Sequence, residues 1–395
     1  MRLYSPEFTA DPRTVYDRMR REHGHLVPVE VATGVSATLV IGYRAALRIL
    51  SDPDRFPSDP RAWESSLPEN CPVLPIMEWG TIGSGAEEEH RTRYRPAYLE
   101  TLRAVDLFTL RREVEAAAVP LINEFCSAGK ADLLDQFAVP LTVRVVNNLL
   151  GLSPEVGERV FDAMAVLRDA PDEETSDRYN QRLTGDLLEA VSAKRREPGT
   201  DVISRLISHP AGLDDAEIVA QLAVLYARGS EPTWNLIVNT VLLMLTDKQF
   251  HDDLLAGALT VRDAIDEVLF VNPPLANSCA RYPRQPQLVE NVWLPADHPV
   301  IISSTGCNSD PAVAGDRIGN RSHLAWGAGS RSCPAQSATL VIVQEALDQL
   351  LDALPEIELA MPADQLEWRP SAFHRAPAAV PVTFPPALPL AVPTP

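Results

Sequence analysis

The sequence is short of positive charge and of long apolar runs, and each shortage excludes a class of protein. Its 35 lysines and arginines face 54 aspartates and glutamates, which gives a net charge of −19 at pH 7. Nucleic-acid binding needs clustered basic side chains, so no nucleic-acid partner is expected. No uninterrupted apolar run approaches the roughly 20 residues that a membrane-spanning helix needs, so no membrane anchor is expected.

Cysteine is also scarce. None of the cysteines forms a CxxC pair, their number is odd and their spacing is wide, so neither a zinc site nor a disulfide framework is indicated. The five are Cys71, Cys126, Cys279, Cys307 and Cys333. All except Cys333 are expected to be packing residues. The first 24 residues are charged and lack the apolar core of a signal peptide. Together these features predict a protein of the reducing cytoplasm.

What is present is a mainly helical pattern with a small β part, expected as one domain over residues 1–395. Helices are predicted over residues 12–23, from Pro154, over 214–245 and over 337–354, because caps and apolar periodicity mark them. The β-rich part is predicted from three separate segments. These are residues 26–41, 275–305 and 356–384. A proline-rich tail over 385–395 is predicted to be extended or disordered.

The stretch "HLAWGAGSRSCPAQ", residues 323–336, carries the clearest chemistry. Its glycines permit left-handed backbone and close approach to a flat ligand. The following helix start favours a negative sulfur at Cys333, and Pro334 removes an amide that would lack a partner there. The loop is therefore suited to hold a thiolate toward an electron-poor partner. The plainer alternative is a helix-capping turn with a buried cysteine.

This stretch resembles the haem-binding loop of cytochrome P-450 enzymes of the soluble actinobacterial type, F-G-x-G-x-H/R-x-C-x-G. The resemblance implies a triangular helical body, with haem b (iron protoporphyrin IX) between the long central helix and the cysteine-ligand helix. It makes Cys333 the axial thiolate and metal ligand, and it places Arg331 on a haem propionate. The remaining loop positions matched to cofactor binding are Trp326, Gly327, Gly329 and Ala335. Trp326 replaces the usual Phe and Ala335 the usual last Gly.

The resemblance covers nearly the whole chain and implies further roles. "GAEEEHRTRYRPAY" resembles the helix whose His and Arg bind a propionate, although its register is shifted by one. Either His90 or Arg91 takes the first position, and Arg93 and Arg95 are the favoured aligned basic residues. Arg281 matches another propionate-binding arginine. The family's layout also implies four residues of the substrate pocket. These are Trp79, Arg228, Pro232 and Leu275.

The long helix predicted over 214–245 departs from the family's A-G-x-D/E-T-T pattern, whose acid and first threonine relay protons in oxygen activation. Glu231 keeps the acid, but Pro232 replaces the alcohol. An internal proline removes an amide and clashes with a carbonyl one turn back, so the helix is expected to kink or open there. Ser230, Thr233, a water or the substrate would have to supply the missing hydroxyl.

A second departure falls in "DEVLFVNPP", where the family carries Glu-x-x-Arg. Glu267 is present, but Phe270 stands at the arginine position. A buried glutamate without a cation shifts its pKa or finds another partner. The later segment offers Arg317 and Arg321, and we predict that one of these meets Glu267 or that Glu267 is partly solvated.

The resemblance implies a haem-thiolate oxidoreductase, either a monooxygenase or an oxidative coupling enzyme, acting on a small natural-product intermediate of bacterial secondary metabolism. Electrons would come from a ferredoxin and its reductase, and a monomer is the default expectation. Two alternatives stay open. A non-catalytic P-450-like helper of a biosynthetic enzyme fits the two altered motifs but not the retained Cys333. A peroxide-using haem enzyme fits Pro232, but Glu231 precedes it where such enzymes carry arginine.

Overall fold

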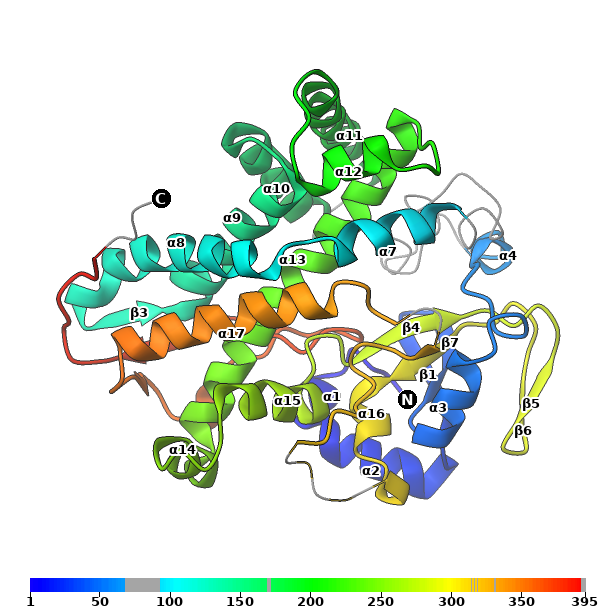
Figure 1. The fold of residues 1–395 in the computed structure, drawn as a ribbon. Helices are drawn as coiled ribbons and strands as arrows, with labels where there is room; N and C mark the ends of the chain where they lie inside the picture. The colour runs from blue at the N-terminus through cyan, green and yellow to red at the C-terminus, as the bar shows by residue number, and fades with distance from the viewer. Residues whose placement is uncertain are drawn as a thin grey trace. The chain divides into compact units, whose positions relative to one another are not determined.

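The computed structural model describes residues 1–67, 93–168, 172–313, 315, 317, 319–329 and 332–391, apart from the side chains of residues 168, 173, 255 and 279. The described chain is mainly helical with a small β part, as predicted (Figure 1). It groups into two compact units, each built from segments far apart in the sequence. The first takes its described residues from 1–79, 238–333 and 361–380, and the second from 80–237, 334–360 and 381–395. A single domain stays a prediction.

The first unit contains a four-stranded sheet of order β1-β2-β7-β4. Strands β1 (Leu26–Ala32) and β2 (Val35–Val40) form an antiparallel hairpin, in which Gly34 takes a φ of +80°. Strand β7 (Val300–Ser303) runs parallel to β2, and β4 (Asn277–Arg281) runs antiparallel to β7. The alternating valines of β1 bury one face of the hairpin, which explains why these β-branched residues form strands. The strands predicted over 26–41 and 275–305 are confirmed.

A separate hairpin and several helices complete the first unit. The hairpin joins β5 (Gln287–Val289) and β6 (Val292–Leu294). Helix α2 begins where the sequence predicts, because the Asp11 side chain accepts from the amide of Thr14. The helical elements of this unit, α2 included, are α1 (Pro6–Ala10), α2 (Pro12–His23), α3 (Tyr43–Leu50), α4 (Arg61–Glu64), α14 (Lys248–Leu255), α15 (Val261–Val271), α16 (Ser304–Asn308) and the short turns Pro311–Val313 and Ala363–Gln365.

The second unit is mostly helical, and its core lies among α7, α9, α10, α11, α12 and α13. Ser153 accepts from the amide of Val156 and so caps α10, as its sequence predicts. The helices of this unit are α7 (Arg95–Arg103), α8 (Leu107–Phe125), α9 (Val139–Leu150), α10 (Pro154–Arg168), α11 (Glu173–Arg196), α12 (Val202–Ser208), α13 (Asp215–Thr246, to Ile237 in this unit) and α17 (Gln336–Ala353), with a 3-10 turn at Cys126–Ala128 and a π-helical turn at Leu134–Ala138.

The second unit also holds a three-stranded sheet that the sequence pattern did not fully reveal. Strand β3 (Lys130–Asp132) pairs with β9 (Pro381–Thr383), which pairs with β8 (Glu358–Leu359). Strand β3 was missed because three residues between helical segments carry no detectable period-2 pattern.

The start of the proline-rich tail is extended and bound rather than disordered. Asn123 on α8 donates to the Leu390 carbonyl at 3.0 Å and accepts from its amide at 2.7 Å, while the Ala387 amide donates to the Cys126 carbonyl. The extended alternative therefore holds for residues 385–391, where the partly buried Asn123 side chain and the Cys126 carbonyl bind the backbone. Within the described ranges, no helix has both the length and the apolarity needed to cross a membrane.

Candidate active site

The cysteine loop is closed by backbone hydrogen bonds. The Cys333 amide donates to the Trp326 carbonyl at 2.7 Å, and the Gly327 amide donates to the Leu324 carbonyl at 2.9 Å. These two bonds bring the cysteine back to the beginning of the loop. The thiol is thus held on a defined turn, three residues before the first residue of α17.

Both glycines of the loop are required by its backbone. Gly327 and Gly329 each have a φ of +68°, a region that residues with a side chain rarely adopt. At Gly329 a Cβ atom would also lie 2.9 Å from the carbonyl oxygen of Leu50. The loop therefore packs against the end of α3 with its backbone, which explains why the sequence carries glycine at this position.

The residues of the loop fit a cofactor that binds at the sulfur. Cys333 is partly exposed and, among the described residues, is not half of a disulfide. The Trp326 indole Nε1 is buried and has no hydrogen-bond partner in the described part of the chain, and such an atom calls for an explanation. No group of three or more His, Cys, Asp or Glu side chains in the described ranges could hold a metal ion.

The other cysteines differ from Cys333. Cys126 and Cys307 are 1% and 0% exposed, as predicted for packing residues, and burial raises the pKa of the Cys307 thiol far above its usual range. The side chains of Cys71 and Cys279 lie outside the described residues. Among the described cysteines, Cys333 alone is more than marginally exposed.

Several residues matched to the cofactor or substrate lie outside the described residues, namely His90, Arg331 and Trp79. Arg93 is described, and its guanidinium binds both carboxylate oxygens of Glu217, at 2.5 and 2.9 Å, and the carbonyls of Ala211 and Gly212. This contact ties the segment before α7 to the start of α13. A propionate at Arg93 stays a prediction, and it would require this ion pair to be shared or exchanged.

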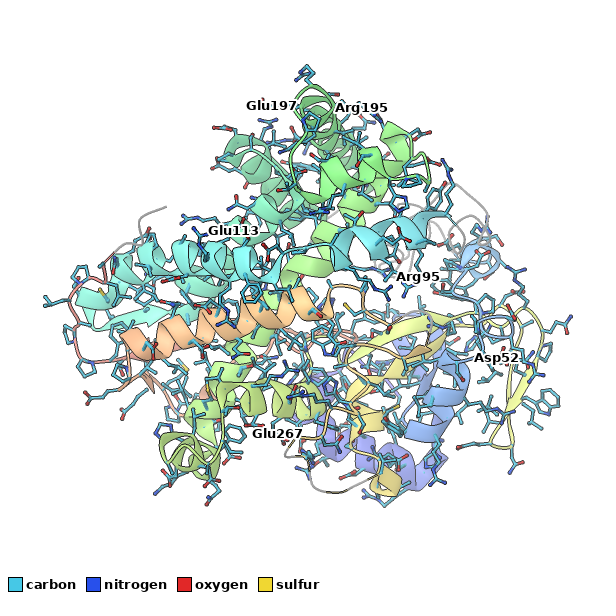
Figure 2. All side chains as sticks on the ribbon, viewed as in Figure 1. Asp52, Arg95, Glu113, Arg195, Glu197 and Glu267 are labelled. Atoms are coloured by element: carbon cyan, nitrogen blue, oxygen red, sulfur yellow. The ribbon has the colours of Figure 1, made fainter. Side chains whose placement is uncertain are left out.

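Two further arginines are well defined. Arg281 is 4% exposed, and its Nη1 donates to the Ala280 carbonyl at 2.9 Å. Arg95 stands at the first residue of α7 and donates to the Tyr98 hydroxyl at 2.8 Å (Figure 2). Arg281 matches a propionate-binding arginine by resemblance, and its contact with a cofactor stays a prediction.

Helix α13 continues through Pro232, so the predicted opening of the helix is wrong. The segment is α-helical from Asp215 to Thr246 with Pro232 inside it. An internal proline removes one amide from the hydrogen-bond ladder, and the bonds of the neighbouring turns together with tertiary packing hold the helix here.

The polar side chains that follow on α13 are not equivalent. The Thr233 hydroxyl donates to the Gly229 carbonyl of its own helix at 2.6 Å. The Ser230 side chain is 3% exposed, yet its hydroxyl has no hydrogen-bond partner among the described residues. Asn235 is 1% exposed, and both polar atoms of its amide likewise lack a described partner. Sequence reasoning missed Asn235, although an asparagine between Trp234 and the apolar residues "LIV" was a usable signal.

The residues assigned to the substrate pocket differ in their exposure and contacts. Arg228 is exposed and Pro232 is partly buried. Leu275 forms an isolated antiparallel bridge with His374, and its carbonyl accepts from the Ser304 hydroxyl at 2.7 Å. The structure thus places Leu275 beside His374. Their contact with a substrate stays a prediction.

Glu267, whose usual arginine partner is replaced by Phe270, binds another arginine, as predicted. Glu267 stands on α15 (Figure 2). Arg317 Nη1 donates to Glu267 Oε1 at 2.6 Å. Burial raises the pKa of the Glu267 carboxyl, and the Arg317 charge acts against that rise. Arg321 binds Asp266 instead of Glu267, with Nε 2.9 Å from Oδ2. Of the two arginines offered, Arg317 is therefore the partner of Glu267.

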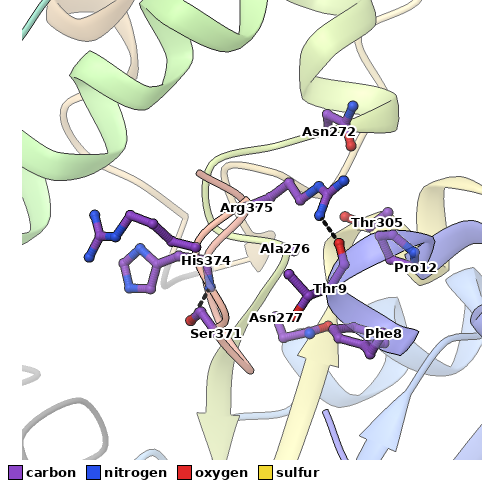
Figure 3. Close-up of a pocket in the computed structure, with 11 residues that line it drawn as sticks. Phe8, Thr9, Pro12, Asn272, Ala276, Asn277, Thr305, Ser371, His374 and Arg375 are labelled. Carbon is purple, nitrogen blue, oxygen red and sulfur yellow. Dashed lines mark hydrogen bonds between the residues drawn. The ribbon is translucent and has the colours of Figure 1, made fainter. Parts of the chain in front are cut away.

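A small cavity of the first unit lies beside the segment that contains His374 (Figure 3). Its volume is about 20 Å³, which suits roughly one water molecule and excludes an organic substrate. The Arg375 guanidinium points toward Thr9 and Thr305, donates to the Thr9 carbonyl and lies 3.6 Å from the centre of the Trp368 ring. Burial lowers the pKa of Arg375 to about 10. This cavity is a feature of packing and not the substrate site.

Comparison with known proteins agrees with these features, although no family model matches the chain. The chain is 28% identical to the cytochrome P450 monooxygenase PikC of Streptomyces venezuelae over 398 residues, which are 96% of this chain and 92% of PikC. It is 28% identical to mycinamicin IV hydroxylase/epoxidase of Micromonospora griseorubida over 368 residues, 89% of this chain and 90% of that protein.

Solved structures show the same fold. CYP154C4 from a Streptomyces species superposes with a TM-score of 0.87 at 24% identity, and the match covers 99% of this chain and 100% of that one. The match is full-length in sequence and in fold, and the cysteine loop is intact. Over nearly its full length, in sequence and in fold, the chain is similar to cytochrome P450 monooxygenases.

Proposed function

We propose that this chain is a haem-thiolate monooxygenase of bacterial natural-product biosynthesis and that Cys333 is its axial ligand. The observation that carries the proposal is the closed loop in which the Cys333 amide binds the Trp326 carbonyl and both glycines take a φ of +68°. A bound haem supplies the redox chemistry, and a thiolate ligand pushes electron density toward its iron.

Residues around the loop would hold the cofactor in place. Gly327 and Gly329 let the backbone approach a flat macrocycle, and the buried indole N–H of Trp326 can donate to an acceptor that arrives with it. Ala335 keeps the position after Pro334 small. Arg281 would bind a propionate, with His90, Arg93 and Arg331 as the further basic residues at that edge.

Proton delivery would depend on Glu231 and Ser230 rather than on Thr233. The Thr233 hydroxyl is engaged by the Gly229 carbonyl, whereas the Ser230 hydroxyl has no partner among the described residues. A hydroxyl that is already donating to its own helix is a poor relay, because it must break that bond to pass a proton. We assign Glu231 as the acid and Ser230 as the hydroxyl that orders a relaying water.

The substrate would be a small natural-product intermediate, and the reaction a hydroxylation or epoxidation. The names of the relatives PikC and mycinamicin IV hydroxylase/epoxidase support this choice over oxidative coupling. Leu275 and the segment at His374 would line the pocket. A ferredoxin and its reductase would supply the electrons. A monomeric state and a cytoplasmic location stay predictions that the cysteine and charge pattern favours.

The proposal is tested by a binding screen followed by turnover. Purified protein is titrated with natural-product intermediates while the haem absorption is recorded, and ligands that change the iron spin state are incubated with ferredoxin, reductase and NADPH. We expect a product heavier by one oxygen atom. Cys333→Ser is the control and should give neither the spin-state change nor product. Product formation by Cys333→Ser at the rate of the unmodified protein would contradict the role of Cys333.

A further inference from the structure

Residues 321–324, here called the loop base, lead directly into the cysteine loop and are fixed to α15. Arg321 Nε donates to Asp266 Oδ2 at 2.9 Å. The His323 ring meets the Phe270 ring edge-on, with centroids 5.2 Å apart and planes at 86°. Both partners stand on α15, one turn apart. The base of the cysteine loop therefore follows the position of this helix.

Asp266 is the centre of a small ion cluster. Its side chain is 4% exposed, and its two carboxylate oxygens lie 3.1 Å from Nε of Arg262, one turn earlier on the helix. Arg321 completes the cluster from the loop base. One buried acid with two arginines has the composition of the family's Glu-x-x-Arg arrangement, but the helical arginine precedes the acid here instead of following it. A buried carboxylate held by two guanidinium groups resists displacement, since losing a partner leaves a buried charge.

Phe270, which stands where the family carries arginine, packs against the loop base. Phe270 is 7% exposed and His323 is 6% exposed, so the ring pair is buried. Burial lowers the pKa of His323 to about 4, so its ring is neutral at ordinary pH. A neutral imidazole packs edge-on against a phenyl ring at little cost, whereas an arginine at this position would place a cation where Arg317 already lies 6.0 Å from the ring centroid.

Asn308 connects the C-terminal end of α15 to Leu324, the last residue of the loop base. Its Nδ2 donates to the carbonyls of Leu269 and Phe270, at 3.0 and 3.2 Å, and its Oδ1 accepts from the Leu324 amide at 2.8 Å. The side chain is 8% exposed. It satisfies the last carbonyls of α15 and an amide of the loop base at once.

We infer that the cluster Arg262–Asp266–Arg321, with the Phe270–His323 pair and Asn308, positions the cysteine loop in this chain in place of a Glu-x-x-Arg pair. Asp266 and Arg321 are positioning residues that act through the loop base on the sulfur of Cys333. The inference rests on the proposed function, because its readout is the thiolate ligation of haem. In this inference Asp266 is the acid that fixes the loop base to α15, and the neighbouring Glu267–Arg317 pair contributes less to the position of the loop.

The test compares Arg321→Ala with Arg317→Ala, a matched arginine of the same segment, and with Arg321→Lys as the conservative variant. Each protein is reduced and exposed to carbon monoxide, and the share of absorption in the red-shifted thiolate band is measured from pH 6 to pH 8 beside circular dichroism. We expect haem affinity and thiolate share to fall about tenfold in Arg321→Ala, as for residues that orient a metal ligand. Arg321→Lys should recover part of the loss, and Arg317→Ala should change little. Asp266→Asn should match Arg321→Ala where it folds.

Two outcomes overturn the inference, and a third separates it from the proposed function. The anchor is wrong if Arg321→Ala folds and keeps the thiolate share of the unmodified protein. It is also wrong if Arg317→Ala loses as much as Arg321→Ala, because the neighbouring pair would then carry the position. An unmodified protein that binds haem without a thiolate band would overturn the role of Cys333 itself.

Discussion

Helices α13 and α15 have each lost one polar residue of the family's pattern, and the two losses have different consequences. On α15, the surroundings of Phe270 are rebuilt: Glu267 has Arg317, and Asp266 has two arginines. On α13, no hydroxyl stands at Pro232, and Ser230, the hydroxyl proposed to act in its place, has no partner among the described residues. A buried acid must be neutralised for the chain to fold, whereas a missing catalytic hydroxyl costs no folding free energy. Structural losses are compensated within the chain, and catalytic losses can be left to water or substrate.

The largest expected effect concerns the α13 side of this comparison. Glu231→Gln should lower kcat roughly a hundredfold and Ser230→Ala roughly tenfold, because general acid–base groups contribute on this scale. Thr233→Val should change kcat by less than about threefold, since its hydroxyl already binds the Gly229 carbonyl. The measurement is product formed per NADPH consumed, with the ligand that gives the largest spin-state change. A Thr233→Val enzyme as impaired as Ser230→Ala would mean that Thr233 replaces the lost alcohol after all.

The next effect concerns His323 and the α15 side. The folded protein holds this ring neutral with a pKa of about 4, whereas an unfolded histidine titrates near 6.5. Between these values the unfolded state binds more protons, so stability falls as pH drops from about 6.5 toward 4 and levels off below. The loss is on the order of 3 kcal/mol. His323→Phe keeps a ring against Phe270 but cannot take up a proton. In denaturant unfolding, the free energy of unfolding of this variant should no longer show the loss that His323 causes as the pH falls. An unchanged pH profile would contradict the burial of a neutral histidine.

Restoring the family's arginine should not help. Phe270→Arg is expected to lower the free energy of unfolding by about 2 kcal/mol, because it introduces a cation into a buried aromatic position beside Arg317. Thermal unfolding of the holoprotein measures this, with Phe270→Leu as the size-matched apolar control. A Phe270→Arg protein more stable than the unmodified protein would contradict this comparison. The lost arginine on α15 would then be as poorly compensated as the lost alcohol on α13.

The smallest effect belongs to the Glu267–Arg317 pair. The Glu267 side chain is 24% exposed, against 5% for Asp266, so solvent screens the charge of Glu267 more strongly. Arg317→Ala should cost less than about 1 kcal/mol of unfolding free energy, as for partly exposed ion pairs. Chemical denaturation at two ionic strengths checks this, with the exposed Arg55→Ala as a surface control. A cost of several kcal/mol would move the anchor of α15 from Asp266 to Glu267.

The sequence predicted the parts of the molecule that local chemistry dictates. Asp11 and Pro12 mark the start of α2, glycines mark the cysteine loop, and a cation for Glu267 was expected from the cost of a buried charge. What could not be predicted depends on distant packing. Arg262 and Arg321 meet on Asp266 although 59 positions separate them, and no local pattern records that contact. Helix α13 likewise stays intact at Pro232, since its surroundings override the propensity of one residue.

The candidate site divides in the same way. Cys333 could be predicted as the thiolate ligand because a haem-thiolate loop is a continuous motif. The difference between Ser230 and Thr233 required the structure, because it depends on which hydroxyl donates to the helix backbone. Asn235 was visible as a polar residue in an apolar run, but its lack of a described partner was not.

The most direct test is the absorption spectrum of the purified, unmodified protein after reduction and addition of carbon monoxide. Our account predicts a strongly red-shifted Soret band over the whole population, because the rebuilt contacts of α15 hold the loop and the Cys333 thiolate in place. A protein without haem, or with the band of a neutral ligand, would contradict it. The changed motifs would then have abolished the enzyme, and a helper role toward a partner protein would become the better explanation.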